Sequence, residues 1–138
     1  MIVLDTNIIS EVFKLAPDPH VLAWAHRQDD LQVYTTAITR GELLYGLNIM
    51  AQGKRSDLLT AGLRHVFDVR FAGRVLPFDG PAADAYALIL AERRRMGRPT
   101  GIADAMIAGI VRSRGARLAT RNVRDFEDCG IALIDPWQ

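Results

Sequence analysis

The sequence predicts an α/β fold, a three-layer α/β/α sandwich with a central, mainly parallel β-sheet. The first observation is that short apolar runs, typical of strands buried on both faces, alternate with longer segments of helical periodicity. The second is composition: the 138 residues are 49% hydrophobic and 24% charged, as in a globular protein, and they fit one domain, residues 1–138. Ligands of such folds bind beyond the carboxyl ends of the strands.

The chain opens with the apolar, partly β-branched run Met1–Leu4, which predicts a buried parallel strand. A helical pattern follows to about Leu15, where Pro17 and Pro19 are expected to stop it. The next predicted elements are a short helix over Val21–Arg27 and a strand over Gln32–Thr35.

The middle of the chain predicts two helices. The first covers Ile38–Ala51, with a C-terminal stop at Gly53. Its apolar stripe consists of Leu43, Leu44, Leu47 and Ala51. The second and weaker helix covers Ser56–Phe71. Its side chains expected to face inward are Leu58, Leu59, Leu63, Val66 and Phe67.

The last part predicts a strand over Arg74–Phe78 and a helix from Pro81 to about Met96, ended by Gly97. Thr100 is expected to cap the following helix, Ile102–Ser113, which Gly115 ends. The apolar stripe of that helix begins at Ile102. Two short strands complete the sheet, Arg117–Thr120 and Ala132–Ile134.

Four acids fall where this fold class places its sites. Asp5 ends the first strand, Glu42 and Asp104 lie in the first turns of two helices, and Asp125 follows the strand Arg117–Thr120. Each alone has an ordinary structural explanation as a helix cap, a partner of a helix dipole or a turn former. Brought together without a cation, such carboxylates repel one another and their pKa values rise.

A bound divalent ion would remove that repulsion, and oxygen-only ligands suit Mg²⁺ or Mn²⁺. Thr6, Asn7 and Thr120 add uncharged oxygens that can orient a carboxylate or a metal-bound water. The three histidines are isolated, and the chain has neither a Gly-x-Ser-x-Gly nor a glycine-rich phosphate loop. The acids therefore carry the predicted chemistry.

Arginines concentrate in one part of the chain. Nine lie between Arg93 and Arg124, and the same stretch holds one acid, Asp104. This local excess of positive charge predicts a surface that attracts a polyanion, although Arg93–Arg95 also suit a helix C-terminus. Arg121 and Arg124 are the candidates to bind phosphates of that polyanion, because they follow the strand that ends at Thr120.

The cysteine content and the distribution of apolar residues indicate where in the cell the protein works. The single cysteine, Cys129, allows no intramolecular disulfide, which suits a reducing cytosol. The first residues do not form a signal peptide, and no apolar run approaches the length of a membrane span. We therefore expect a cytoplasmic protein with no membrane contact.

Four segments resemble PIN-domain ribonucleases. They are Met1-Ile-Val-Leu-Asp5-Thr6-Asn7, Ala37-Ile-Thr-Arg-Gly-Glu42-Leu, Ile102-Ala-Asp104-Ala-Met-Ile-Ala and Leu118-Ala-Thr120-Arg121-Asn122-Val-Arg-Asp125-Phe126. Phe71–Asp79 and the closing Asp135-Pro136-Trp137 are similar to the VapC/FitB branch of toxins. The resemblance covers essentially the whole chain.

The resemblance implies a PIN-like fold and an Mg²⁺- or Mn²⁺-dependent endoribonuclease, the toxin of a type II toxin–antitoxin pair. It implies a homodimer wrapped by a small antitoxin, which often places a basic side chain in the acidic site. By matched motif, Asp5, Glu42 and Asp104 form the acidic centre. Many relatives carry Asp where this chain has Asn122, so either Asn122 or Asp125 completes the site.

Other functions fit the residues less well. A haloacid-dehalogenase-like phosphatase needs a second acid where this chain has Asn7. A receiver-like module needs paired acids at the first strand and a lysine near the last, and Leu118–Ile134 contains no lysine. A catalytically inactive PIN domain that only binds RNA stays open, and a metal titration with a nuclease assay separates it from an enzyme.

Overall fold

The computed structural model describes all 138 residues and has a five-stranded sheet at its centre. The strands are β1 (Ile2–Leu4), β2 (Val33–Thr36), β3 (Val75–Leu76), β4 (Arg117–Ala119) and β5 (Ala132–Ile134). Their order is β3-β2-β1-β4-β5, and every neighbouring pair is parallel. The carboxyl ends of all five strands therefore meet at one edge.

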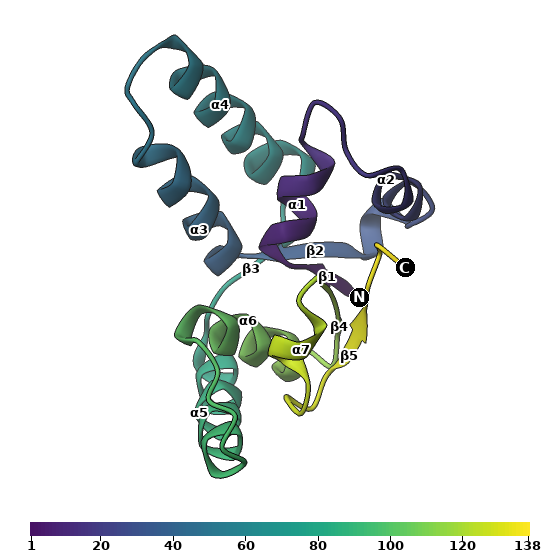
Figure 1. Cartoon of the computed structure of the whole chain (residues 1–138), viewed down its shortest axis with the longest axis vertical. Coiled ribbons are helices and arrows are strands. Elements are labelled where there is room, and N and C mark those ends of the chain that lie inside the picture. The colour runs from purple at the N-terminus through teal and green to yellow at the C-terminus, as the bar shows by residue number, and fades with distance from the viewer.

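Helices cover both faces of this sheet (Figure 1). Four lie on one side: α1 (Thr6–Val12), α2 (Pro19–His26), α3 (Ala37–Asn48) and α4 (Lys54–His65). Three lie on the other: α5 (Gly80–Arg95), α6 (Ile102–Ser113) and α7 (Val123–Phe126). A 3₁₀ turn, Asp30–Gln32, precedes β2, and a π-helical turn, Val66–Arg70, extends α4. The predicted three-layer α/β/α architecture is confirmed, with a sheet that is entirely parallel.

Two hydrophobic cores result from the alternation of side chains along β1. Val3 packs into the core that contains α5, α6 and α7 residues such as Ile107 and Phe126. Ile2 and Leu4 point to the opposite face and pack with α1 and the end of α4. All three β1 residues are buried, as the apolar run Met1–Leu4 predicted. The central strand is therefore held from both sides, which fixes the position of Asp5 directly after it.

Proline marks the start of a helix where we expected an end. The first helix stops at Val12, before the expected Leu15, which is fully exposed. Pro19 is the first residue of α2, and the Asp18 side chain caps that helix by accepting from His20 N at 2.8 Å. Proline suits this position because the first helical N–H has no intrahelical acceptor.

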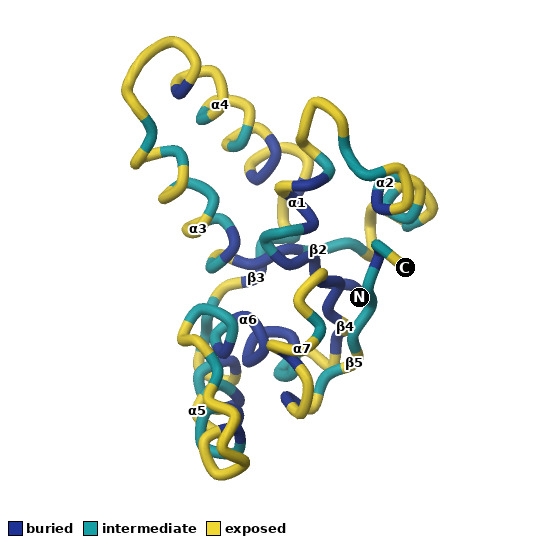
Figure 2. Tube along the Cα trace, in the orientation of Figure 1, coloured by how far each residue is buried: buried dark blue, intermediate teal, exposed yellow.

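The hairpin of α3 and α4 also differs from the prediction. Helix α3 ends at Asn48, so Ala51 lies outside it and is exposed, and Gly53 precedes α4 rather than stopping α3. Leu58 and Leu59, expected to face inward, are 74% and 44% exposed. The reason is that the two helices extend away from the sheet (Figure 2), and α4 packs on α3 rather than on the sheet. Within them, the structure buries only two side chains, those of Thr39 and Ser56.

Smaller corrections concern the last third of the chain. The predicted strand Arg74–Phe78 is reduced to Val75–Leu76, and the short helix α7 was not predicted. Thr100 does not cap α6, because its hydroxyl donates to the Asp125 carbonyl at 3.4 Å and Gly101 holds the cap position. Ile102 is 59% exposed, so the buried stripe of α6 begins one turn later. No helix is long and apolar enough to cross a membrane.

Candidate active site

Asp5 occupies the carboxyl end of β1 and caps α1. One carboxylate oxygen, Oδ1, accepts from Thr6 N at 2.8 Å, and the other, Oδ2, accepts from Thr120 Oγ1 at 2.7 Å. The side chain is only 4% exposed. Burial raises the pKa of Asp5, the hydrogen bonds from Thr120 and Thr6 oppose that rise, and the charges of Glu42 and Asp125 add to it. Asp5 is therefore both a structural cap and a constrained acid of the site.

Asn7 connects Asp5 to the end of β4. Its Nδ2 donates to Asp5 Oδ2 at 3.3 Å and contacts Thr120 Oγ1 at 3.5 Å. Its Oδ1 accepts from the backbone N–H of Arg121 at 3.3 Å. One amide thereby joins the loops that follow two neighbouring strands. Asn7 and Thr120, predicted as supporting residues, both contact the Asp5 carboxylate.

Glu42 reaches the site from the second turn of α3. Thr6 Oγ1 lies 2.8 Å from Glu42 Oε1 and 3.1 Å from Thr39 Oγ1. A hydroxyl has one hydrogen, so when Thr6 donates to the carboxylate, Thr39 must donate to Thr6. Thr39 is fully buried, and the sequence reasoning missed it. Its signal was a threonine one turn before Glu42 on the same helix.

Asp104 differs from Asp5 because no hydrogen bond lowers its pKa. It lies in the first turn of α6, half-buried. Burial, followed by the charges of Asp5, Asp125 and Glu42, raises the pKa of Asp104 to about 6. The charges of Glu42 and Asp125 therefore act on both Asp5 and Asp104. Among Asp5, Glu42 and Asp104, only Asp104 accepts no hydrogen bond from the protein, so its carboxylate is free to coordinate an external ligand.

A polar cleft of about 370 Å³ contains three of the four acids, Asp5, Glu42 and Asp104. Asn122 also lines it, and its backbone N–H donates to Thr120 Oγ1 at 3.0 Å. Asp125 is exposed in the first turn of α7 and does not line the cleft, although its charge reaches Asp5 and Asp104. The remaining lining residues are Thr6, Asn7, Ser10, Glu11, Lys14, Arg121 and Trp137.

The donor set of this cleft fits a hard divalent cation. Its candidate ligands are carboxylate oxygens only. Burial, with a smaller contribution from mutual repulsion, raises the pKa values of Asp5 and Asp104, and a bound cation would lower them again. As the side chains stand, no three acidic, histidine or cysteine side chains are grouped closely enough to hold a metal ion. Glu42 is held back by Thr6, so a complete ligand set requires side-chain rotation or water.

Lys14 and Glu11 line the cleft beyond the acids, and the sequence reasoning missed both. Glu11 is buried, and its carboxylate accepts from Lys14 Nζ at 3.0 Å and from Asp18 N at 3.1 Å, which lowers its pKa. The usable signal was spacing. Asn7, Glu11 and Lys14 follow one another at intervals of four and three residues, which places them on one face of a helix.

Four of the nine arginines of the basic segment are already engaged by carboxylates or carbonyls of the protein. Arg98 pairs with Glu127 and Asp128 at 3.1 and 2.7 Å. Arg112 and Arg114 pair with Glu92 and Asp79, and Arg93 is buried and donates to the Glu127 carbonyl. Arg121 lines the acidic cleft, whereas Arg124 lies on α7 outside it. The polyanion surface expected from local charge is thus reduced to fewer free guanidinium groups.

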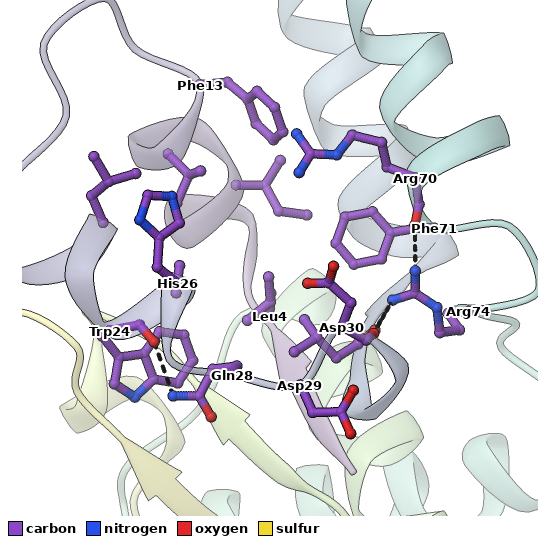
Figure 3. A pocket seen from close by; sticks show the side chains of 15 residues that line it. Leu4, Phe13, Trp24, His26, Gln28, Asp29, Asp30, Arg70, Phe71 and Arg74 are labelled. Atoms are coloured by element: carbon purple, nitrogen blue, oxygen red, sulfur yellow. Dashed lines mark hydrogen bonds between the residues drawn. The ribbon is translucent and has the colours of Figure 1, made fainter.

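A larger and more apolar groove lies elsewhere, between α1, α2 and the end of α4 (Figure 3). Phe13, Trp24 and Phe71 contribute to its walls, and Arg74 donates to the carbonyls of Asp30 and Arg70. None of the four candidate acids lines this groove. The chemistry predicted from the acids therefore belongs to the smaller cleft.

Known proteins match the chain over its whole length. The PIN domain family matches residues 2–131. VapC ribonuclease Y4jK from Sinorhizobium fredii is 43% identical over 100% of this chain and 99% of that protein. Toxin FitB from Neisseria gonorrhoeae is 36% identical over 99% of each chain. The tRNA(fMet)-specific endonuclease VapC from Shigella flexneri is 33% identical over 97% of this chain and 96% of its own length.

Solved structures show the same fold. The crystal structure of FitAcB from Neisseria gonorrhoeae superposes with a TM-score of 0.93 at 36% identity, over 100% of this chain and 99% of that one. A member of the VapBC family of toxin-antitoxin systems, VapBC-5 from Mycobacterium tuberculosis, superposes with a TM-score of 0.66 at 26% identity, over 96% and 95%.

Proposed function

The chain belongs to the PIN-domain family, and from this membership and the acidic cleft we propose that it is a metal-dependent endoribonuclease and the toxin of a toxin–antitoxin pair. The observation that carries the proposal is the convergence of Asp5, Glu42 and Asp104 in one cleft, with the pKa of Asp104 raised to about 6. Crowded carboxylates without a cation among them favour a divalent metal.

Asp5, Glu42 and Asp104 are the residues that would hold Mg²⁺ or Mn²⁺. When bound, such an ion activates water and neutralises charge on the scissile phosphate. Thr120 and Asn7 hold the Asp5 carboxylate in one orientation, and Thr6 does the same for Glu42. Arg121, at the edge of the cleft, binds the RNA backbone. Asn122 brings an amide but no charge to the cleft. Asp125 lies outside the cleft, and its charge raises the pKa of Asp104.

The test is cleavage of fluorescent RNA, a tRNA fraction and an unstructured oligoribonucleotide, in Mg²⁺, Mn²⁺ or EDTA. We expect Asp5→Asn and Asp104→Asn each to abolish cleavage in folded protein, and Asp125→Asn to reduce it less. The matched control is Asp84→Asn, an exposed acid on α5 outside the cleft, which should cleave normally. Undiminished cleavage by Asp104→Asn would contradict the proposal. RNA binding without cleavage in any metal would instead identify a non-catalytic RNA-binding domain.

The toxin role predicts a protein partner and a second copy of the chain. Four large hydrophobic side chains on the α3–α4 hairpin are exposed, namely Tyr45, Ile49, Leu58 and Leu59. Exposed apolar side chains gathered on one element mark an interaction surface. We expect expression of the chain alone to arrest bacterial growth, and co-expression of a small neighbouring antitoxin to restore it. Unimpaired growth at high levels of soluble, folded protein would count against the role.

A further inference from the structure

Two residues that follow neighbouring strands meet at the edge of the acidic cleft. Arg121 comes two residues after β4, and Trp137 comes three residues after β5. The guanidinium carbon of Arg121 lies 5.0 Å from the centre of the Trp137 ring, within the range of a cation–π interaction. Both residues line the cleft that contains Asp5, Glu42 and Asp104.

The indole of Trp137 is a fixed support. Its backbone N–H donates to Asp135 Oδ1 at 3.0 Å, and the preceding Pro136 is buried. The ring is half-buried and packs against the core formed by Ile2, Leu4 and their neighbours. Because the core holds the ring and the guanidinium lies over it, its structural role is to orient Arg121.

The main chain of Arg121 is fixed independently of its side chain. Its N–H donates to Asn7 Oδ1, and the same Asn7 donates to Asp5 Oδ2. The distance from the Arg121 backbone to the acid is therefore set by one amide. The long side chain, which would otherwise sample many rotamers, is set by the tryptophan.

The charge of Arg121 is available to an external anion. Arg98, Arg112 and Arg114 each pair with a carboxylate of the protein, whereas Arg121 forms no ion pair and stacks on an uncharged ring. Resting on the proposed ribonuclease function, we propose that Trp137 is a positioning residue, which holds the Arg121 guanidinium where it binds an RNA backbone phosphate next to the cleavage site. A fixed planar cation offsets the repulsion between the acids and the incoming strand.

A double-mutant cycle tests the inference by RNA binding, without relying on cleavage. All variants carry Asp104→Asn, so a fluorescent single-stranded oligoribonucleotide binds without being cut, and fluorescence anisotropy gives the Kd at several KCl concentrations. We expect Arg121→Ala to weaken binding about tenfold and to reduce the salt slope by about one. Trp137→Leu should weaken binding several-fold, Trp137→Phe less, and Arg121→Ala/Trp137→Leu no more than Arg121→Ala alone.

Additive effects of the Arg121 and Trp137 substitutions on RNA affinity would overturn the inference. If Trp137→Leu weakens binding by the same factor with and without Arg121, the tryptophan acts on the fold and does not position the arginine. Unchanged affinity in Trp137→Phe and Trp137→Leu also refutes the inference, and Trp137→Phe keeps the test decisive if the leucine variant fails to fold. Unchanged RNA affinity in Arg121→Ala, with loss of antitoxin binding, assigns the pair to the protein partner. Wild-type cleavage is measured in parallel, so failure of the proposed function is recognised separately.

Discussion

Asp104→Asn is expected to stabilise the metal-free protein. The folded chain raises the pKa of Asp104 from 3.8 to about 6 by burial and by the charges of Asp5, Asp125 and Glu42. Above pH 6, the ionised side chain therefore opposes folding, by at most about 3 kcal/mol at 1.36 kcal/mol per pKa unit. Since the side chain is only half-buried and water screens it, we expect about 1–2 kcal/mol.

The pH dependence has a definite sign. The amide in the Asp104→Asn variant carries no charge, so the stability advantage of the variant over the wild type is full above the folded pKa of about 6. As the pH falls from 6 toward 3.8, the folded wild type takes up a proton that the unfolded chain does not yet bind, and the advantage declines. Only well below pH 3.8 are both states protonated, so the advantage should be small at pH 4 and absent about one pH unit lower.

Thermal unfolding in EDTA between pH 4 and 8 measures this effect. At pH 7.5 the melting temperature of Asp104→Asn should exceed that of the wild type by about 3–6 °C. Added Mg²⁺ should stabilise the wild type more than the variant, because only the wild type retains the full acid set. Asp5→Asn is a useful contrast. Because the Asp5 carboxylate accepts three hydrogen bonds, we expect this substitution not to raise the melting temperature. A loss of more than about 2 kcal/mol in Asp104→Asn, or a gain that does not vary with pH, would refute the electrostatic reasoning.

Two further substitutions test packing and hydrogen bonding, each by urea unfolding. Thr120→Val removes the buried hydroxyl that donates to Asp5 and should cost about 1–3 kcal/mol. Thr120→Ser keeps that hydroxyl and should cost less; a larger loss in Thr120→Ser than in Thr120→Val would show that packing of the methyl group outweighs the hydrogen bond. Gly109→Ala places a Cβ 2.6 Å from the Ala82 carbonyl oxygen, where α5 crosses α6, and should lower the free energy of unfolding by about 2 kcal/mol or more. The control is Gly46→Ala on α3, which has open space around it and should be neutral or stabilising. An unchanged stability of Gly109→Ala would mean that α5 moves easily to accommodate the methyl group.

The position of the acids could be predicted because a parallel sheet brings all strand ends to one edge. Asp5 and Glu42 are 37 residues apart in sequence, yet both follow neighbouring strands, β1 and β2. The ends of elements were less predictable. Pro19 was interpreted as a stop and is a start, since proline is compatible with the first turn of a helix as well as with the residues after one.

What covers a side chain could not be predicted from the pattern. The stripe through Leu58 and Leu59 is helical in spacing, but periodicity shows which residues are apolar and not which partner buries them. The partner of a charged side chain could not be predicted from the local sequence either. Arg114 looked free because the acid that pairs with it, Asp79, is 35 residues earlier in the chain. The pairing of Arg121 with Trp137 likewise depends on two strands lying side by side.

The α3–α4 hairpin has a consequence for the lifetime of the site. This segment has two buried side chains in its two helices, and three more are only partly buried against the cores, those of Ile38, Leu43 and Leu63. It therefore buries less apolar surface than α6, and we expect its amides to exchange with solvent through local opening at a lower free energy than global unfolding needs. Glu42 belongs to this hairpin, whereas Asp5 and Asp104 belong to elements anchored on the sheet. Each opening event would withdraw one carboxylate and leave the other two in place. If Asp5, Glu42 and Asp104 hold the metal as proposed, the ligand set is complete only while α3 stays docked on the sheet.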